Sequence, residues 1–160
     1  AGGKDNDIRG VQTLLTAMGN LQHVGPTGAG HAMKALNNYV SAAGLLASFQ
    51  ALATAKDAGI SPETFIKVIN SSTGRNNTTE VKLEKFVLPE TFNSGFALQL
   101  MAKDVNIARE LIEAAGYTTP VTPALAACLG SAVTALGQHA DHTALYSYVT
   151  DKSDAEGLDK

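Results

Sequence analysis

The stretch Gly25-Pro26-Thr27-Gly28-Ala29-Gly30-His31-Ala32-Met33-Lys34-Ala35-Leu36-Asn37-Asn38 joins a glycine-rich turn to the longest uninterrupted helical pattern of the chain. No proline interrupts that pattern from His31 to Asp57, and Gly59 supplies a stop signal. The free N–H groups of the first helical turn face the glycines, which let a ligand approach the backbone closely. The junction therefore suits an anion such as a carboxylate or a phosphate.

Lys34 and Asn38 are four residues apart, a spacing that places an amine and an amide on one face of the predicted helix. Two better-known glycine signatures are absent here. A phosphate-binding P-loop has Lys directly after its last glycine, whereas Gly30 is followed by His31. A dinucleotide fingerprint has a third glycine at the position that Met33 occupies.

Length and composition favour a single domain with its own core. The chain has 160 residues, of which 44% are hydrophobic. A net charge of −3 and the lack of a Lys/Arg cluster argue against nucleic acid or an anionic membrane as a partner. The apolar run Tyr39–Ala55 is interrupted by polar residues and is interpreted as a buried core helix. The single Cys128 cannot form a disulfide within the chain, which indicates a cytoplasmic location.

The segment before the glycine turn combines two patterns. Residues 7–19 carry apolar side chains at helical spacing, and Gly19-Asn20 ends that helix. Residues 21–24 alternate in the manner of a short strand.

The rest of the chain predicts further helices. Ser61-Pro62-Glu63 is a helix start, with Ser as the cap, Pro at the first position and an acid in the first turn. The other expected helices cover residues 80–87, 98–112, 124–136 and 141–149. Residues 150–160 are charged and poor in apolar side chains, which is typical of a loose tail. An all-α, multi-helix domain follows.

Two motifs carry a resemblance to a known family. The first is Gly-x-x-Gly-x-Gly-x-x-x-Lys-x-x-x-Asn at Gly25, Gly28, Gly30, Lys34 and Asn38, and the second is Phe96-Ala97-Leu98-Gln99-Leu100-Met101-Ala102-Lys103-Asp104. Together they resemble the β-hydroxyacid dehydrogenase family, which includes 3-hydroxyisobutyrate dehydrogenase, tartronate semialdehyde reductase and, more distantly, 6-phosphogluconate dehydrogenase. The resemblance covers nearly the whole chain.

The resemblance implies a division of the chain. Residues 1–25 would be the tail of an upstream Rossmann dinucleotide-binding domain. Residues 26–149 would form a helical substrate and dimerisation domain like the C-terminal domain of 6-phosphogluconate dehydrogenase, followed by the loose tail 150–160. The Gly-x-Gly-x-x-Gly loop and the ribose-binding acid are not in this sequence. The choice between NAD and NADP, which such enzymes use to oxidise 3-hydroxy acids or reduce the matching semialdehydes, would lie in the upstream domain.

The family match assigns Lys34 as the general acid/base. The positive end of the helix dipole disfavours an ammonium there, as would shielding by Met33, Leu36 and Tyr39. An amine in that setting can take and return a proton. The alternative is an ordinary solvated helix lysine.

The same match assigns Asn38 to the catalytic and substrate-binding group, where its amide can hold the substrate hydroxyl or Lys34. Gly28 and Gly30 would offer backbone N–H groups to the substrate carboxylate, or form only a tight turn at a domain junction. Lys103 would approach the nicotinamide end of the cofactor. A charged pair Lys103-Asp104 within an apolar helical face requires a partner unless it is a plain surface ion pair.

Other polar residues are less informative. His139 and His142 lack a third ligand of suitable spacing, so no metal site is predicted and a helix-end pair is preferred. Asn76 and Asn77 stand where relatives often carry Ser or Cys and then an apolar residue, which leaves the 3-hydroxy acid unidentified.

Two further functions remain open. The chain alone could be a catalytically silent helical substrate-binding or dimerisation module, since its apolar helices favour packing across a homodimer interface. A helical adaptor with no enzymatic ancestry would make the residue 25–38 pattern a coincidence.

Overall fold

The computed structural model describes residues 1–151 as a set of helices. They are α1 (Asp5–Ala17), α2 (Ala29–Asp57), α3 (Pro62–Asn70), η1 (Thr78–Val87), α4 (Leu98–Ala114), α5 (Val121–Leu136), η2 (His142–Ala144) and α6 (Leu145–Thr150). No strand occurs among the described residues, which confirms the all-α prediction. The expected loose tail begins as α6 ends, and its residues 152–160 lie outside the described part.

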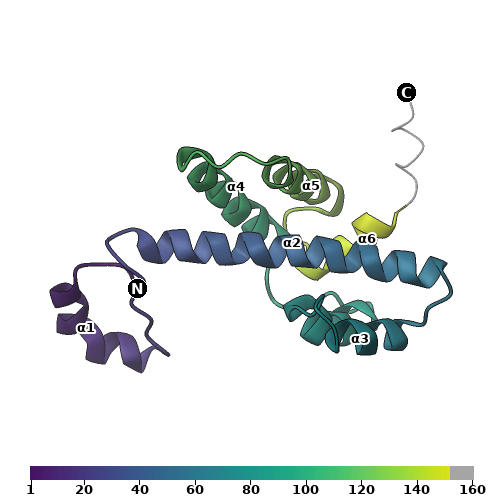
Figure 1. Cartoon of the computed structure of the whole chain (residues 1–160), viewed down its shortest axis with the longest axis horizontal. Coiled ribbons are helices and arrows are strands. Elements are labelled where there is room, and N and C mark those ends of the chain that lie inside the picture. The colour runs from purple at the N-terminus through teal and green to yellow at the C-terminus, as the bar shows by residue number, and fades with distance from the viewer. Residues whose placement is uncertain (152–160) are drawn as a thin grey trace.

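Helix α2 is the axis of the molecule. Its 29 residues give it a length of about 43 Å. Helices α4 and α5 lie on one side of it, and α3 and η1 lie on the other (Figure 1). Its central residues Leu45, Phe49 and Leu52 are fully buried and contact both layers through one hydrophobic cluster. The run Tyr39–Ala55 is therefore a core helix, and no helix among the described residues is long and apolar enough to cross a membrane.

Local sequence signals explain most helix ends. Helix α2 begins at Ala29, two residues before the expected start, and Gly28 precedes it with φ at +93°. Ser61 accepts a hydrogen bond from the Thr64 backbone N–H at 3.2 Å, as expected of a cap. Helix α5 begins at Val121 and not at residue 124, because Pro123 falls in the first turn, where its missing N–H is tolerated.

The helix expected over residues 80–87 begins at Thr78 and is a π-helix. Asn76 holds its start. The Asn76 side-chain oxygen accepts from the Thr78 backbone N–H at 2.8 Å, and its amide donates to Ser48 Oγ on α2 at 3.0 Å. Asn76 therefore has a structural role that attaches η1 to the central helix.

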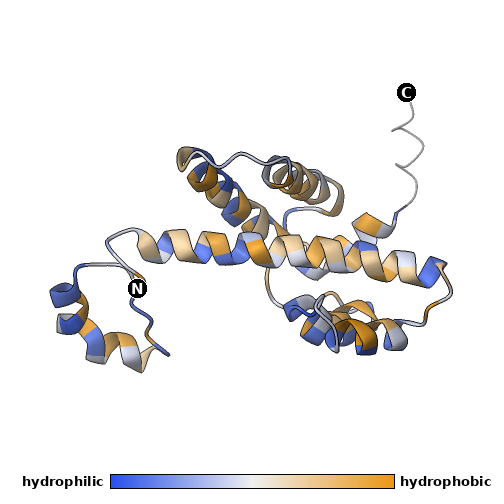
Figure 2. Cartoon of the chain, in the orientation of Figure 1, coloured by the Kyte–Doolittle hydropathy of each residue, from blue (hydrophilic) through white to orange (hydrophobic). Residues whose placement is uncertain are grey.

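Helix α1 stands apart from this core. It has no buried residue, and the apolar side chains of Leu14 and of Met18, the residue that caps its C-terminal end, are 66% and 80% exposed. Figure 2 shows hydrophobic and hydrophilic residues alternating along α1. The strand expected over residues 21–24 is wrong: the segment is extended, but it makes single backbone bonds, such as Val24 N–H to the Ala1 carbonyl at 3.0 Å, without a ladder.

Candidate functional site

The two sequence motifs meet at one buried carboxylate. Lys34 Nζ and Asn38 Nδ2, one turn apart on α2, both donate to Oδ2 of Asp104 on α4, the Asn38 bond being 2.6 Å long. Lys103 Nζ lies 3.6 Å from the other oxygen of Asp104. Asp104 is only 3% exposed, so its charge is compensated by these neighbours and not by water. The structure thus brings together Lys34, Asn38 and Lys103 around a residue that links the two motifs.

Burial by itself would raise the pKa of Asp104. The hydrogen bonds from Lys34 and Asn38, together with the positive charges of Lys34 and Lys103, outweigh this and hold the pKa of that carboxyl below its usual value. Asp104 is therefore an anion at neutral pH. It orients the Lys34 ammonium and the Asn38 amide at the same time.

Lys34 faces the outside of the molecule. Its side chain is 60% exposed, and Met33, expected to shield it, is itself 51% exposed. The shielding expected from Met33 is therefore absent within this chain. The amine is open to a ligand that approaches the α2 and α4 faces. Lys103, on the other side of Asp104, is likewise 60% exposed.

The glycine turn lies one to two helical turns before Lys34. Gly28 has a positive φ and open space where a Cβ would stand, so its backbone is accessible. Gly30 lies beneath the N-terminal residues. A Cβ added to Gly2 would stand 2.7 Å from the Gly30 nitrogen and 2.6 Å from the Pro26 carbonyl oxygen. The N-terminal Ala1–Gly3 segment thus packs directly on this turn, and only glycine permits that approach.

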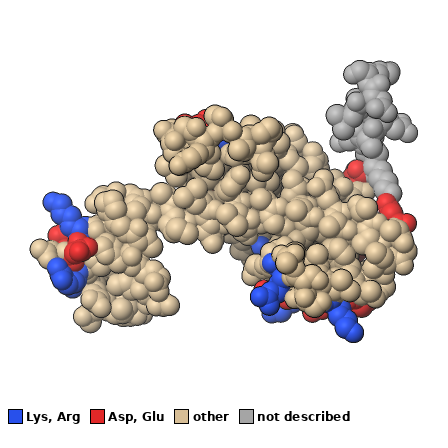
Figure 3. Space-filling model, viewed as in Figure 1, with Lys and Arg blue, Asp and Glu red and all other residues tan. Residues whose placement is uncertain are grey.

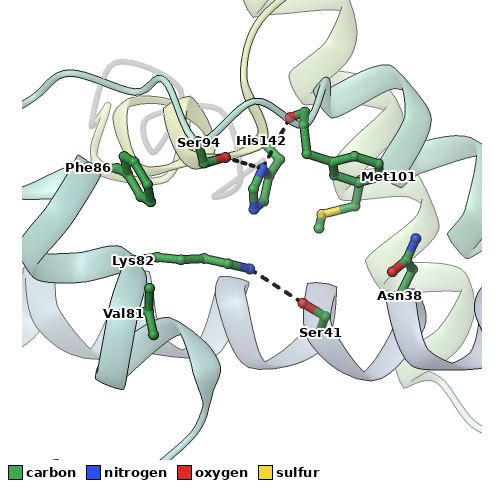
Figure 4. A pocket seen from close by; sticks show the side chains of 9 residues that line it. Asn38, Ser41, Val81, Lys82, Phe86, Ser94, Met101 and His142 are labelled. Atoms are coloured by element: carbon green, nitrogen blue, oxygen red, sulfur yellow. Dashed lines mark hydrogen bonds between the residues drawn. The ribbon is translucent and has the colours of Figure 1, made fainter. Parts of the chain in front are cut away.

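A cavity of about 310 Å³ adjoins the site at Asn38. Figure 4 shows its polar side chains pointing inward from several elements. They are Asn38 and Ser41 from α2, Lys82 from η1, Ser94 from the loop before α4, and His142 from η2; the apolar lining is Val81, Phe86, Phe96 and Met101. Lys82 Nζ is 3.5 Å from Ser41 Oγ. Burial lowers the pKa of Lys82, an effect that the negative charge of Asp141 opposes.

Asp141 fixes one wall of this cavity. Its carboxylate accepts from the Gly95 backbone N–H at 2.8 Å, from the Ser94 hydroxyl at 2.9 Å and from the Thr143 backbone N–H at 2.9 Å. Burial alone would raise the pKa of Asp141, but these hydrogen bonds lower it overall. Asp141 caps the last helical segment, at the start of the helix expected over residues 141–149, and also ties the loop before α4 to η2.

His142 and His139 do not form the helix-end pair that the sequence suggests. His142 is 4% exposed, and its Nδ1 lies 3.1 Å from the Phe96 carbonyl oxygen, whereas His139 is exposed and its ring lies 3.5 Å from the Gln138 amide. Burial lowers the pKa of His142, and the charge of Lys82 lowers it further. Among residues 1–151 no three His, Cys, Asp or Glu side chains are grouped to hold a metal ion.

Sequence reasoning missed Asp104 as the centre of the site, although a charged pair in an apolar helical face already required a partner. It also missed Lys82 and Ser94. No periodicity or motif marks these two residues, because their shared cavity is formed only when η1 and the loop before α4 pack on α2.

The chain is similar to a known family of dehydrogenases. Residues 28–149 match the family model described as NAD-binding of NADP-dependent 3-hydroxyisobutyrate dehydrogenase. The 2-(hydroxymethyl)glutarate dehydrogenase of Eubacterium barkeri is 35% identical over 113 residues, which are 70% of this chain and 38% of that protein. The NAD-dependent L-serine dehydrogenase of Pseudomonas aeruginosa is 31% identical over 127 residues, 75% of this chain and 43% of that protein.

A solved structure shows the same fold. Mycobacterium tuberculosis 3-hydroxyisobutyrate dehydrogenase with L-serine superposes with a TM-score of 0.82 at 27% identity, covering 92% of this chain and 53% of that one. The chain thus spans about two fifths of the curated relatives' length and about half of the solved one. On the family match and on the pairing of its two motifs, the chain belongs to the β-hydroxyacid dehydrogenase family of NAD(P)-dependent oxidoreductases and carries its helical, NAD-binding C-terminal domain.

Proposed function

We propose that the chain is the helical domain of an NAD(P)-dependent dehydrogenase that oxidises a small 3-hydroxy acid, or reduces the matching semialdehyde, with Lys34 as general acid/base. The observation that carries this proposal is the convergence of Lys34 and Asn38 on buried Asp104. An amine, an amide and a carboxylate held in this way can position a hydroxyl and move its proton.

The hydrogen bonds support the following roles for the chain's own residues. In oxidation the Lys34 amine takes the proton from the substrate hydroxyl, and in reduction the Lys34 ammonium returns it to the carbonyl oxygen. Asp104 stabilises the ammonium and keeps the Asn38 amide in place. Asn38 holds the substrate oxygen next to Lys34 in both directions. The exposed side of Lys34 is the side from which the substrate reaches it.

The substrate class is supported by the relatives. One is named for the hydroxy acid 2-(hydroxymethyl)glutarate, one for L-serine, and the solved M. tuberculosis enzyme is described with L-serine. In each of these acids the hydroxyl is on the carbon β to a carboxylate. We assign the turn of Gly28 and Gly30, whose backbone is open at Gly28, to the end of the site that precedes Lys34 on α2.

The donor set also fits the cofactor. When bound, NAD or NADP would accept the hydride from the substrate carbon. Lys103 would face its nicotinamide end, since Lys103 is exposed and contacts the same carboxylate as Lys34, Asp104. The Lys103 ammonium can donate a hydrogen bond to that end of the cofactor.

The division of the chain is part of the proposal. Residues 1–25 belong to the end of an upstream dinucleotide-binding domain, and residues 26–149 form the helical domain. Two observations support it: the family match begins at residue 28, and α1 buries none of its residues against the helical core. The uncovered apolar side chains of α1 would then pack on the rest of the upstream domain.

A second candidate function is favoured by the surface. Large apolar side chains are exposed on the core helices α2, α4 and α5, notably Val40, Leu100 and Val121. Figure 3 shows charged residues gathered on α1 and around α3 and η1, while the face over α2 and α5 is almost uncharged. We infer that this face forms a homodimer or a higher homo-oligomer, and that the isolated chain is an assembly module without activity of its own.

The decisive test uses the full-length enzyme. Lys34→Met should lower kcat of oxidation by at least about 100-fold, the usual loss when a general acid/base is removed. The limb of the pH–rate profile that reports this proton transfer should vanish. Asn38→Ala should lower kcat and raise KM together, because the amide orients the substrate oxygen. The matched control is Lys67→Met on α3, an exposed helix lysine that should keep wild-type kinetics. A Lys34→Met enzyme with near-normal turnover and an unchanged pH limb would reject the role of Lys34.

A further inference from the structure

We propose that the cavity next to Asn38 holds a second carboxylate of the substrate on Lys82, so that the preferred substrates are 3-hydroxy dicarboxylic acids. This inference rests on the proposed function, because it places the reacting hydroxyl at Lys34 and Asn38. It adds a specificity-determining residue outside both sequence motifs.

Lys82 has no partner of opposite charge close to it. Among residues 1–151 no carboxylate oxygen lies within 4 Å of Lys82 Nζ, and its hydrogen bond goes to the neutral Ser41 hydroxyl at 3.5 Å. The nearby Asp141 is already saturated by donors from Ser94, Gly95 and Thr143. Lys82 is half-buried and its amine points into the cavity (Figure 4). A half-buried ammonium that makes no ion pair within 4 Å, and whose nearest acid is occupied by other donors, can bind an anion.

The walls of the cavity strengthen that attraction. Val81, Phe86 and Met101 line the same cavity with apolar groups, so the effective dielectric constant there is lower than in water. Ser41 lies next to the amine and can donate its hydroxyl proton to an anion held there. Lys82 and Ser41 thus form the anion-binding wall.

His142 forms the opposite wall and is an acceptor. The Phe96 carbonyl oxygen can only accept, so the hydrogen on the imidazole resides on Nδ1, 3.1 Å away. The other nitrogen, Nε2, then presents a lone pair to the cavity (Figure 4). Because that lone pair repels an anion, the bound carboxylate lies against Lys82 and Ser41, while His142 accepts from an N–H or O–H group.

The position of the cavity connects it to the substrate. Asn38 is shared by the cavity and the Asp104 cluster, and Ser41 follows three residues later on the same helix face. Asn38 and Ser41 are about 4.5 Å apart along the α2 axis, a distance that a short carbon chain can span. A single ammonium balances the single charge of a carboxylate, whereas a phosphate calls for more cations or a forked guanidinium, which the cavity lacks.

A binding experiment on the 160-residue chain tests the anion site without catalysis. Succinate and butyrate have four carbons each and differ by one carboxylate, and inorganic phosphate is the third probe. We expect succinate to shift the NMR signals of the Lys82 and His142 side chains at lower concentration than butyrate or phosphate. The shift should be lost in Lys82→Met, and it should persist in Lys82→Arg and in Lys85→Met, which removes an exposed lysine of the same helix. Equal shifts by butyrate, tighter binding of phosphate, or an unchanged response in Lys82→Met would overturn the site.

The second experiment measures specificity in the full-length enzyme. We expect kcat/KM to be higher for 2-(hydroxymethyl)succinate than for 2-(hydroxymethyl)butanoate, in which a methyl group replaces the second carboxylate. Lys82→Met should reduce the ratio of the two kcat/KM values by about 10- to 100-fold, the usual effect of losing a hydrogen bond to a charged group. A ratio that Lys82→Met leaves unchanged would overturn this inference while the proposed function stands. Lys82-dependent succinate binding without oxidation of either acid would retain the anion site and reject the proposed function.

Discussion

Asp104→Asn is the substitution that most directly tests the centre of the site. The asparagine has nearly the same shape, so its side-chain oxygen can still accept from Asn38 and Lys34, but without a negative charge. A hydrogen bond to a charged group contributes about 1.5–3 kcal/mol and a neutral one about 0.5–1.5 kcal/mol, so each bond loses roughly 1 kcal/mol. Because Lys34 is 60% exposed, its share is reduced by solvent screening. We expect Asp104→Asn to lower the free energy of unfolding by about 1–2 kcal/mol at pH 7.

The lowered pKa of Asp104 fixes how this loss of stability changes with pH. The folded pKa of Asp104 lies below its usual value, so the folded state favours the ionised carboxylate. The stabilisation from Asp104 is fully present above the pKa of the unfolded chain, about 3.9, and is lost as the pH falls through the lower folded pKa. The difference between wild type and Asp104→Asn should therefore be constant from pH 5 to 7 and shrink at more acidic pH.

Urea unfolding of the 160-residue chain between about pH 3 and pH 7 measures this difference. The matched control is Glu113→Gln, which removes a carboxylate from the same helix, where it pairs with Arg109 at 3.2 Å on the surface. That exposed pair should contribute at most about 0.5 kcal/mol. A loss in Asp104→Asn no larger than in Glu113→Gln, or one that does not shrink with acidification, would refute the view of Asp104 as the buried acceptor of the two motifs.

Two further predictions concern the isolated chain. Calorimetric titration with NAD or NADP should show no binding tighter than about millimolar. A dissociation constant of 1 mM already requires about 4 kcal/mol of binding free energy, most of which would come from an upstream domain. Micromolar binding would contradict this. Light scattering at tens of micromolar should give the mass of a dimer or a larger oligomer. Salt should not dissociate it, because the exposed face over α2 and α5 is apolar and almost uncharged. A monomer mass at every salt concentration would count against this prediction.

Much of the fold was predictable because its signals are local. The absence of proline from residues 31–57, the Ser61 cap and the Gly59 stop are local signals, and the structure places helix ends near all of them. The π-helical form of η1 was not predictable, because its start is held by Asn76, which bonds to Ser48 on another helix. The strand pattern of residues 21–24 failed since alternation alone does not supply a partner strand.

The residues of the site likewise differ in whether the sequence or the tertiary structure determines their arrangement. The sequence by itself determined that Lys34 and Asn38 share a helix face, since a spacing of four residues fixes that in any α-helix. It also determined that Asp104 was unusual, as a charge within an apolar helical pattern. Only the tertiary structure decided that these residues meet, because the contact between α2 and α4 joins positions 66 to 70 residues apart. The same holds for Lys82, which becomes a half-buried cation facing Asn38 and His142 only when α2, η1, the loop before α4, α4 itself and η2 enclose one cavity. Helical periodicity acts over a few residues, whereas burial of a charge depends on which distant surfaces cover it.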